Sequence, residues 1–572
     1  MFNTKKVFTF MTVLICSVFF SMGSIHVLKA AEITPTPSQD YALKMEPGWN
    51  LGNTFDGFDT NGDRGEESWG NPKVTKELIQ SIKAEGFNSI RIPFTALMRI
   101  GEGPDYTIDP VFLERYAEVV NWALDEGLYV MINLHHDSWN WAKNIGSDDG
   151  SALEQYKAIW RQLAEYFKDY PDKVCFESLN EPQFNGTEEE QIAINNQVNQ
   201  VFYDIARNSG GKNTSRMLVL PTLYTNDSQE RCTSLYNAIK ALNDPHIIAT
   251  FHYYGPWTFS VNIAGQTTFN DTVKNEINGA FDRVFNTFVS QGIGVICGEY
   301  GLLGFDTSLD TIEKGEVLKY MEYLGYYAKQ KEVTMMLWDN GQHFNRYDYT
   351  WSNPSMINMI KTSLENRSSY TESDRIFIKK GTGVSEVTEK LSLNGNTLIS
   401  IHDGNGPLVL DQDYTISTLT DDTVTLKASY LEGVLTNTYG ENAALTFKFS
   451  QGEDWKVFIH GYDRATMAPA QDTTDSLTIP VNYNGDLVST MEALYEDGTA
   501  AGPQNWTTYK EFGKTFKPNY TDQTLTITSD FFAETNNGQV TLKVHFLSGE
   551  VVTYTIVKSE NTVTGTPVEV NN

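Results

Sequence analysis

Hydrophobic residues between about residues 41 and 361 follow two alternating patterns. Short runs of consecutive apolar residues are separated by longer stretches in which apolar residues recur every three or four positions, as Leu78, Ile79 and Ile82 do. The first pattern is typical of strands buried on both faces, and the second of amphipathic helices. The apolar runs lie at 48–53, 89–94, 129–135, 174–181, 217–223, 247–254, 293–300 and 334–340. The helical stretches between them include 74–85, 111–126, 153–170, 188–207 and 311–330.

Strand–helix units repeated eight times over roughly 320 residues match the number and size of a (β/α)8 TIM barrel. In that fold, parallel strands close into a ring inside a layer of helices. We therefore predict an α/β TIM-barrel domain over residues 32–366.

The pattern changes after about residue 367. Helical periodicity ends, and short runs rich in Thr, Val and Leu lie between Asn-Gly, Asp-Gly and Gly-Asp turn signals. This pattern predicts two all-β, immunoglobulin-like sandwich modules over residues 367–465 and 466–560. The polar residues 561–572 predict a disordered tail. The predicted strand runs include 423–431, 444–452, 455–462, 524–532 and 540–557.

The first 31 residues have the parts of a secretory signal peptide. Lys5 and Lys6 form a charged start, residues 7–22 are mostly apolar, and small residues end the segment at Ala31. We therefore expect a secreted, extracellular protein. An uncleaved membrane anchor is the alternative, because the apolar stretch is about as long as a short anchor.

The charge balance narrows the class of partner. The predicted signal segment holds three lysines and no acid, so its removal takes the formal net charge from −30 to about −33. Such a surface argues against nucleic acid and anionic polymers, and it suits a neutral substrate. Cys175, Cys232 and Cys297 form an odd, sparse set that is no disulfide framework, and no spacing indicates a metal site. We expect a monomer that needs no metal or cofactor and does not bind a membrane once the signal is removed.

Polar side chains close most of the predicted barrel strands. Reactive groups of TIM-barrel enzymes lie at the carboxyl ends of the strands, so these residues are expected to converge on one rim. Because a barrel needs no polar residues there for stability, the convergence indicates an active site. The residues are Asn53, Arg91, His135, His136, Asn180, Glu181, His252, Tyr254, Glu299 and Trp338.

Glu181 and Glu299 end the fourth and seventh predicted strands, which face one another across the mouth of an eight-stranded barrel. Two carboxylates so placed can straddle a glycosidic bond. We expect the pKa of Glu181 to be raised by a partly apolar, like-charged environment, which would keep a general acid protonated. If the two carboxyl groups lie about 5–5.5 Å apart, the reaction retains the anomeric configuration.

Seven of the eight strand ends resemble the signatures of glycoside hydrolase family 5. They occur in order across residues 41–361, and only the strand at 217–223 has none. The motifs are Gly-Trp-Asn-Leu-Gly-Asn-Thr at 48–54, Ser-Ile-Arg-Ile-Pro at 89–93, Ile-Asn-Leu-His-His at 132–136, Asn-Glu-Pro at 180–182, His-Tyr-Tyr at 252–254, Gly-Glu-Tyr at 298–300 and Trp-Asp-Asn at 338–340.

This resemblance implies a role for each residue. Glu181 would be the acid/base and Glu299 the nucleophile of a double displacement. Asn180 would bind the 2-hydroxyl of the reacting sugar. Arg91 and Tyr254 would keep Glu299 ionised, although Arg91 also fits a buried structural ion pair.

The remaining strand-end residues would complete the site. The resemblance implies that His135 and His252 orient the network, that His136 and Asn53 touch substrate, and that Trp338 is the floor beneath the reacting sugar. For His136 the alternative is a packing role. Aromatic residues on rim loops could line further sugar subsites or pack as ordinary core, and they are Trp69, Trp139, Trp141 and Trp257.

The two β modules also resemble known modules. Residues 375–464 resemble the immunoglobulin-like X2 module of bacterial cellulases, and residues 465–557 resemble carbohydrate-binding module family 46. In relatives with this arrangement the terminal module helps to complete the cleft. Trp506 is the expected sugar contact of that module, with a core position as the alternative.

We therefore expect a secreted, retaining endo-β-1,4-glucanase, or cellulase, that acts on cellulose or β-glucan. The alternative within the same mechanism is a xyloglucanase or an enzyme active on mannan or xylan. A non-catalytic, polysaccharide-binding wall protein is the other class, and it would be expected to lack one of the two carboxylates.

Overall fold

The computed structural model describes residues 34–62, 64–417 and 422–568. The chain divides into two compact units, residues 1–35 and 36–572, and the second contains all the elements below. The predicted signal peptide lies outside the described residues. Within the described ranges, no helix combines the length and apolar character needed to cross a membrane.

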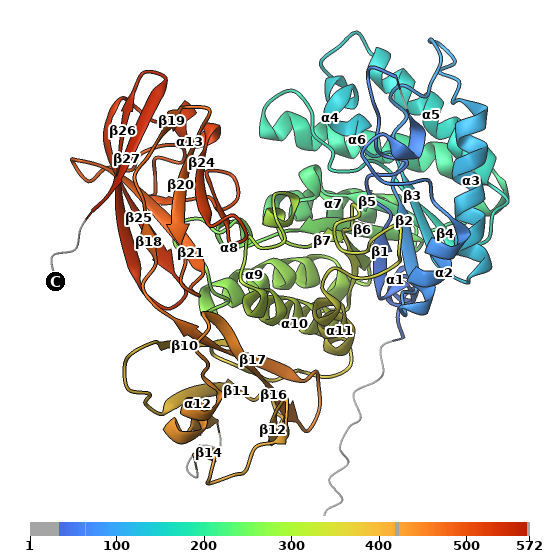
Figure 1. Cartoon of the computed structure of the whole chain (residues 1–572). Helices are drawn as coiled ribbons and strands as arrows, with labels where there is room; N and C mark the ends of the chain where they lie inside the picture. The colour runs from blue at the N-terminus through green and yellow to red at the C-terminus, as the bar shows by residue number, and fades with distance from the viewer. Residues whose placement is uncertain (1–33, 63, 418–421, 569–572) are drawn as a thin grey trace, which may run out of the picture. The chain divides into compact units, whose positions relative to one another are not determined.

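Parallel strands form a closed barrel in the order β1 to β8, with β1 pairing β8 to close the ring. Each predicted strand lies at its expected place, and helices surround the ring (Figure 1), so the TIM-barrel prediction is confirmed. The strands are β1 (Gly48–Asn50), β2 (Ser89–Ile92), β3 (Tyr129–Asn133), β4 (Val174–Glu177), β5 (Leu218–Pro221), β6 (Ile247–Tyr253), β7 (Gly294–Tyr300) and β8 (Val333–Leu337).

Helices begin at polar caps that the sequence supplies. Thr75 accepts a hydrogen bond from the backbone N–H of Leu78 at the start of α2, and Thr187 forms a capping box with Glu190 at the start of α6. The long helices are α1 (Pro37–Met45), α2 (Lys76–Ala84), α3 (Pro110–Asp125), α5 (Ser151–Phe167), α6 (Glu188–Asn208), α7 (Gln229–Leu242), α9 (Asp271–Thr287), α10 (Lys314–Gln330) and α11 (Pro354–Ser363).

The barrel interior has an apolar layer and a polar layer. Helix α1 closes the amino-terminal end, where Tyr41 and Met45 pack on Met131, Cys175, Val219, Ile248, Ile296 and Met336. Side chains two residues apart on a strand share a face, so Asn133 and Glu177 point inward above Met131 and Cys175. These residues and Arg91 are buried, which places polar groups directly beneath the carboxyl-end rim.

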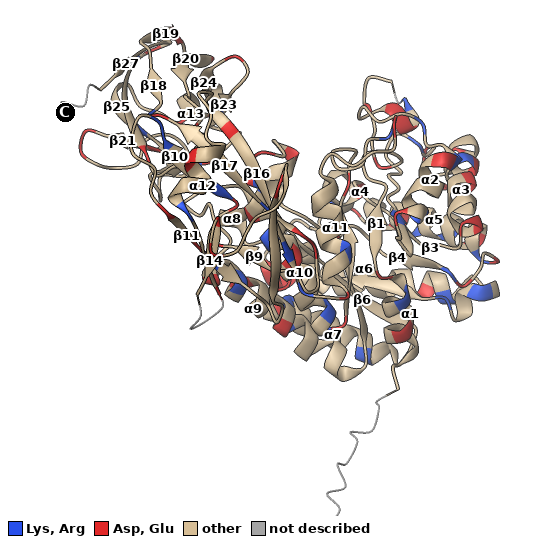
Figure 2. Cartoon of the chain, turned by 60° about the horizontal axis from the view of Figure 1, so that its bottom comes forward, with Lys and Arg blue, Asp and Glu red and all other residues tan. Residues whose placement is uncertain are grey.

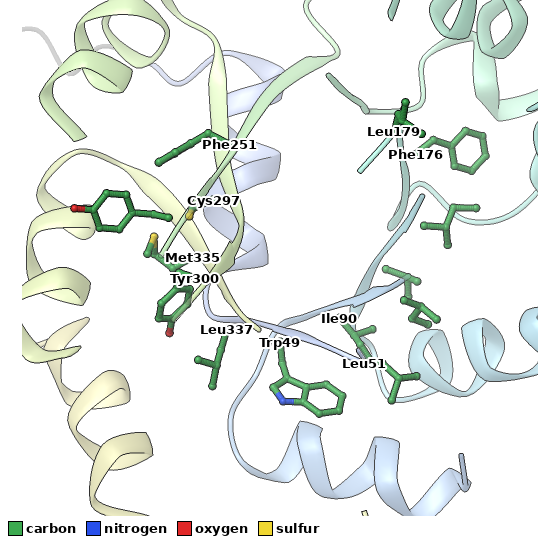
Figure 3. Close-up of a cluster of buried hydrophobic side chains, with 14 of the residues drawn as sticks. Trp49, Leu51, Ile90, Phe176, Leu179, Phe251, Cys297, Tyr300, Met335 and Leu337 are labelled. Carbon is green, nitrogen blue, oxygen red and sulfur yellow. The ribbon is translucent and has the colours of Figure 1, made fainter. Parts of the chain in front are cut away.

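Apolar residues on the outer side of the strands pack against the helices. Figure 3 shows part of this cluster, including Trp49, Phe251, Tyr300 and Leu337, all of them buried. The cluster fixes each strand against its helices, and it leaves the opposite face of the strand to the barrel interior.

Two sheets form the first β module. The sheets have the orders β10-β17-β16-β12-β13 and β14-β15-β11-β9, and their shared core includes Ile401, Phe447 and Trp455. The strands are β9 (Tyr370–Thr371), β10 (Arg375–Lys379), β11 (Val387–Ser392), β12 (Leu398–Asp403), β13 (Gly406–Pro407), β14 (Tyr414–Ile416), β15 (Thr423–Leu426), β16 (Gly440–Phe449) and β17 (Trp455–Tyr462).

The second β module has its own core, which includes Leu477, Met491 and Tyr554. Its strands follow the order β22-β21-β25-β26-β27-β19-β20-β24-β23, and β18 pairs β20. Two β-sandwich modules after the barrel are therefore confirmed. The strands are β18 (Thr466–Met467), β19 (Ala470–Thr473), β20 (Ser476–Asn482), β21 (Val488–Tyr495), β22 (Tyr509–Lys510), β23 (Phe516–Asn519), β24 (Thr524–Thr528), β25 (Gly538–Phe546), β26 (Val551–Ser559) and β27 (Thr562–Pro567).

Two predicted strand runs end in short helices. Run 423–431 turns into α12 (Ala428–Val434), which buries Leu431 against the module core. Run 524–532 turns into α13 (Ser529–Ala533), which buries Phe531 and Phe532. In both places the apolar residues were predicted to lie on a strand. They instead contact the module core from a short helix.

The prediction of a disordered tail from residue 561 is wrong for residues 562–567. These residues form β27, which pairs with both β26 and β19. Val563 is fully buried, and a Cβ at Gly565 would lie 2.4 Å from the Tyr554 ring, so the strand lies close against the core. Its outward threonines gave the segment the polar composition of a tail.

Candidate active site

Glu181 lies on the loop after β4 in an uncommon backbone conformation. Its φ is +38°, in the left-handed region that non-glycine residues seldom adopt, and Pro182 follows it. Hydrogen bonds hold the loop on both sides, from Asn180 N to Leu134 O at 2.8 Å and from Tyr224 N to Pro182 O at 2.8 Å. Strain maintained in this way is typical of functional positions.

Glu299 is directed into the same space from β7. The pairing register of β7 shifts between Cys297 and Tyr300, and a local irregularity of this kind redirects a side chain. The Glu299 side chain is only 6% exposed. Its Oε1 accepts a hydrogen bond from Arg91 Nη1 at 2.7 Å, and its Oε2 accepts one from the Tyr254 hydroxyl at 2.7 Å.

His252 links the two carboxylates. Its Nδ1 lies 3.0 Å from Glu181 Oε1 and 3.5 Å from Glu299 Oε2. A carboxylate oxygen of each glutamate and a ring nitrogen of His252 all lie within 4.8 Å of one another. The structure therefore brings together the glutamates of β4 and β7, as the sequence predicted.

Arg91 connects four side chains beneath the rim. It is fully buried, and it donates from Nε to Glu177 Oε2, from Nη1 to Asn50 Oδ1 and Glu299 Oε1, and from Nη2 to Asn180 Oδ1, over distances of 2.7 to 3.1 Å. Burial opposes its charge, but Glu177 and Glu299 raise its pKa further. The guanidinium therefore forms a buried ion pair with Glu177 and also binds Glu299 directly.

The expected rise in the pKa of Glu181 is wrong. Burial does raise the pKa of this carboxyl, but the hydrogen bond and charge of His252 and the charges of Arg91 and His136 outweigh it, and the pKa is lowered. The sequence indicated the apolar walls and the second carboxylate. It did not indicate that a histidine donor would lie 3.0 Å from the Glu181 oxygen.

His135 lies near Glu299, on the segment after β3. Burial and the nearby charges of His136, Arg91 and His252 lower its pKa well below the ordinary value. Asn133 Nδ2 donates to its Nδ1 over 3.0 Å, which leaves the proton on Nε2, 3.9 Å from Glu299 Oε1.

Trp338 lies against His135 with the rings nearly parallel, at 6° and a centroid distance of 5.7 Å. Gly52 on the loop after β1 permits this position, because a Cβ at Gly52 would lie 2.7 Å from Trp338 Cη2. The indole is therefore held on one edge by backbone and on one face by the His135 ring.

His136 lies among a group of aromatic residues. Its Nδ1 accepts from Trp139 Nε1 at 3.0 Å, so Nε2 carries the proton and lies 3.3 Å from Asp56 Oδ2. Its ring lies 4.8 Å from that of Trp69, and Phe58 lies beside both tryptophans. Trp69 and Trp139 are 37% and 40% exposed, so they offer faces to a ligand.

Two other predicted contacts lie in different settings. Asn53, with φ +54°, donates its backbone N–H to Asp56 Oδ2 and accepts at its carbonyl from Asn71, which holds the loop after β1. Trp141 donates to Asp137 Oδ1 at 2.7 Å and packs on the barrel core, so it is a packing residue.

Trp506 lies in the second β module and is 58% exposed, which excludes the alternative of a core position. Its ring centroid lies 6.1 Å from that of Trp257, which is 44% exposed on the segment after β6. Asn262 joins the segment after β6 to the second β module. Its side chain donates to Ser489 O, and its backbone carbonyl accepts from Phe512 N.

The sequence prediction missed Asn50, Asp56, Phe58 and Glu177. Asn50 donates to Gly298 O and accepts from Arg91, and Glu177 binds Arg91 on the other side. Glu177 lies two positions after Cys175 within an apolar run, with Phe176 between them. Side chains two positions apart on a strand point to the same side, so Glu177 lies inside the barrel together with Cys175. This spacing was the sequence signal that could have identified Glu177.

Two groups have the residue types of a metal site. Ligand atoms of Glu181, His252 and Glu299 lie within 4.8 Å of one another, and so do those of Asp56, His135 and His136. In the first group both Glu299 oxygens already accept hydrogen bonds, one of them from a guanidinium. Both oxygens of this carboxylate are therefore already bound by donors of the protein.

Acidic residues are spread over the barrel helices and the β modules (Figure 2). The formal net charge of the chain is −30. The cationic group at the centre of the site, Arg91, is by contrast fully buried and paired with two carboxylates. The Arg91 guanidinium is therefore not exposed to a bound polymer.

Paired carboxylates at the carboxyl ends of β4 and β7 of a TIM barrel are the arrangement of a glycoside hydrolase. The chain belongs to glycoside hydrolase family 5, since the family model for cellulases (glycosyl hydrolase family 5) matches residues 51–344. Models of a carbohydrate-binding domain X2 and of a second carbohydrate-binding domain, CBM46, match residues 370–459 and 463–566.

Two relatives match nearly the whole chain, and a third matches the barrel. The chain is 48% identical to endoglucanase B of Paenibacillus lautus over 541 residues, 94% of each protein. It resembles the structure of the full-length tri-modular endo-β-1,4-glucanase B of Bacillus halodurans with a TM-score of 0.91 and 45% identity, over 94% of this chain and 100% of that one. A family 5 xyloglucanase from Paenibacillus pabuli matches 57% of this chain and 99% of its own, with a TM-score of 0.51 and 32% identity.

Proposed function

We propose that this protein is an extracellular endo-β-1,4-glucanase that hydrolyses cellulose or β-glucan with retention of anomeric configuration. The observation that carries the proposal is the approach of the two glutamates, with carboxylate oxygens within 4.8 Å of one another. Retaining glycosidases have carboxyl groups about 5–5.5 Å apart, whereas inverting enzymes leave about 6.5–9.5 Å for a water molecule.

In the first step Glu299 attacks the anomeric carbon while Glu181 gives its proton to the departing glycosidic oxygen. The bond to the leaving sugar breaks and an ester bond to Glu299 forms. In the second step Glu181 removes a proton from water, which attacks the same carbon and releases Glu299 as a carboxylate. Asn180 precedes Glu181 and shares the Arg91 guanidinium with Glu299, and its amide suits a bond to the 2-hydroxyl of the sugar.

The free Glu181 carboxyl favours its ionised form, so the proton for the first step depends on the bound state. A substrate that fills the site excludes water, and desolvation disfavours the ionised form. We therefore expect the activity on unactivated substrates to be highest on the acidic side of neutrality, where more free enzyme holds this proton.

Exposed tryptophans support a long, neutral polymer as the substrate. Trp69 and Trp139 belong to one aromatic group and Trp257 and Trp506 to another, which suits sugar rings bound at several subsites. The names of the relatives from Paenibacillus lautus and Bacillus halodurans favour β-1,4-glucan as the polymer. Secretion is proposed from the first 31 residues of the sequence.

The two catalytic roles are separable by leaving group. Glu181→Gln is expected to lose nearly all hydrolysis of barley β-glucan but to keep the first step on 2,4-dinitrophenyl cellobioside, whose leaving group needs no proton. Glu299→Gln is expected to lose both activities. The matched control is Glu322→Gln, since Glu322 is a fully buried carboxylate paired with Arg367 outside the site. Near-parental β-glucan turnover by either catalytic variant would refute the assignment.

Xyloglucan is the second candidate main substrate, because a relative that covers the barrel is a xyloglucanase. Product sizing on carboxymethyl cellulose, β-glucan, xyloglucan, glucomannan and xylan separates the candidates. Release of xyloglucan oligosaccharides with little attack on carboxymethyl cellulose would favour xyloglucan over our first choice. Binding of β-glucan without any reducing-sugar release would favour the non-catalytic alternative.

A further inference from the structure

Glu177 is a buried carboxylate that the mechanism above does not use. It ends β4 inside the barrel, its side chain is 0% exposed, and it does not face the rim. Its Oε2 accepts from Arg91 Nε at 2.7 Å, while its Oε1 is buried with no hydrogen-bond partner among the described residues. Leaving a carboxylate oxygen unpaired costs free energy, so a purely structural role would favour a neutral residue here.

Arg91 is shared between this carboxylate and the nucleophile. Glu177 takes the Nε side of the guanidinium, which leaves Nη1 directed at Glu299 and Nη2 at Asn180. In the free protein the buried cation therefore has two anionic partners, one below it in the barrel and one above it at the rim.

The reaction changes this charge balance. When Glu299 forms an ester with the sugar, its negative charge is consumed, and Arg91 loses one of its two anionic partners. A buried cation without a partner is strongly disfavoured. Glu177 keeps Arg91 paired at that stage, because no atom of Glu177 takes part in the ester.

We propose that Glu177 is a positioning residue that holds Arg91 for Glu299 and serves as its counter-ion while the glycosyl ester exists. This role rests on the proposed function of Glu299 as nucleophile. It predicts that loss of the Glu177 charge slows ester formation and leaves ligand binding in the ground state nearly unchanged, because Arg91 still has Glu299 as a partner in the free protein.

The test follows ester formation directly in the full-length protein. The probe is 2,4-dinitrophenyl 2-deoxy-2-fluoro-cellobioside, which forms an ester that turns over slowly, and the readouts are the rate of mass increase and the labelled peptide. Glu177→Gln is expected to be labelled about 100-fold more slowly than the parent, with its Kd for cellotriose within about threefold. Glu177→Asp keeps the charge on a shorter side chain, and it is expected to be slowed by about three- to tenfold.

Controls distinguish the possible failures. Glu322→Gln removes another fully buried carboxylate with an arginine partner, and it should be labelled at the parental rate. Labelling of the parent at a residue other than Glu299 would refute the proposed function itself. Labelling of the parent at Glu299 with Glu177→Gln at the parental rate would overturn only the role of Glu177. If Glu177→Gln does not fold, a parental labelling rate in Glu177→Asp overturns that role.

Discussion

The hydrogen bond from Tyr254 to Glu299 provides a quantitative test of how the nucleophile is held. Tyr254→Phe removes one hydroxyl that donates to Glu299 Oε2 over 2.7 Å and leaves the Arg91 contact with the other oxygen in place. Burial and the charge of Glu299 raise the pKa of Tyr254 well above its ordinary value, so its hydroxyl is a donor throughout the working range.

The magnitude follows from the charge of the acceptor. A hydrogen bond to a charged group contributes about 1.5–3 kcal/mol, and Glu299 is only 6% exposed, so water replaces the lost donor poorly. Negative charge returns to Glu299 during hydrolysis of the ester, and the bond to Tyr254 stabilises that charge. At about 1.4 kcal/mol per tenfold in rate, kcat should fall by about 10- to 150-fold.

The assay uses 2,4-dinitrophenyl cellobioside, for which hydrolysis of the ester is expected to limit kcat. We expect kcat to fall more than kcat/KM, because Tyr254 stabilises the charge that returns to Glu299 when the ester is hydrolysed. Tyr300→Phe is the matched control, since Tyr300 packs in the apolar cluster behind β7 (Figure 3). A Tyr254→Phe variant within twofold of the parent in kcat would refute the reasoning.

Three further predictions address the substrate floor, the second β module and stability. Gly52→Ala should lower kcat/KM on β-glucan by at least about tenfold without a large change in unfolding midpoint, because its Cβ would displace the Trp338 ring 2.7 Å away; an unchanged kcat/KM would contradict this role of Trp338. Trp506→Ala should raise KM on polymeric β-glucan by several fold and leave hydrolysis of an aryl cellobioside unchanged, because the exposed ring lies near Trp257; equal effects on both substrates would exclude a polymer contact. Burial raises the pKa of Glu46 to about 8, so between about pH 4.5 and 8 the folded protein holds a proton that the unfolded chain has released. The free energy of unfolding should therefore fall as the pH rises through that range. Urea unfolding at pH 5 and pH 8 measures the free energy of unfolding of both proteins. Relative to the parent, Glu46→Gln should be more stable at pH 8 than at pH 5. The same difference in free energy at both pH values would refute the linkage.

Much of the barrel could be predicted because its strands are continuous apolar runs. The rim residues followed from the rule that chemistry lies at the carboxyl ends of these strands, and Glu181, Glu299, Arg91 and Tyr254 do meet there. Glu177 was missed because its run was treated as uniformly apolar, although its spacing from Cys175 places it inside the barrel.

Other features depend on contacts that a sequence pattern does not contain. The lowered pKa of Glu181 depends on the position of the His252 ring. The nearly parallel contact of Trp338 with His135 depends on Gly52, which follows the neighbouring strand β1. Residues 562–567 have the composition of a polar tail, and only their pairing with β19 and β26 makes them a strand.

Double displacement at Glu299 is the central claim, and the configuration of the first product tests it most directly. Proton NMR during the first minutes of cellopentaose hydrolysis distinguishes the two anomers before they equilibrate. Retention predicts that the new reducing end appears first as the β-anomer and then converts to the equilibrium mixture. Initial release of the α-anomer would mean direct attack by water, and it would contradict the assignment of Glu299 as nucleophile.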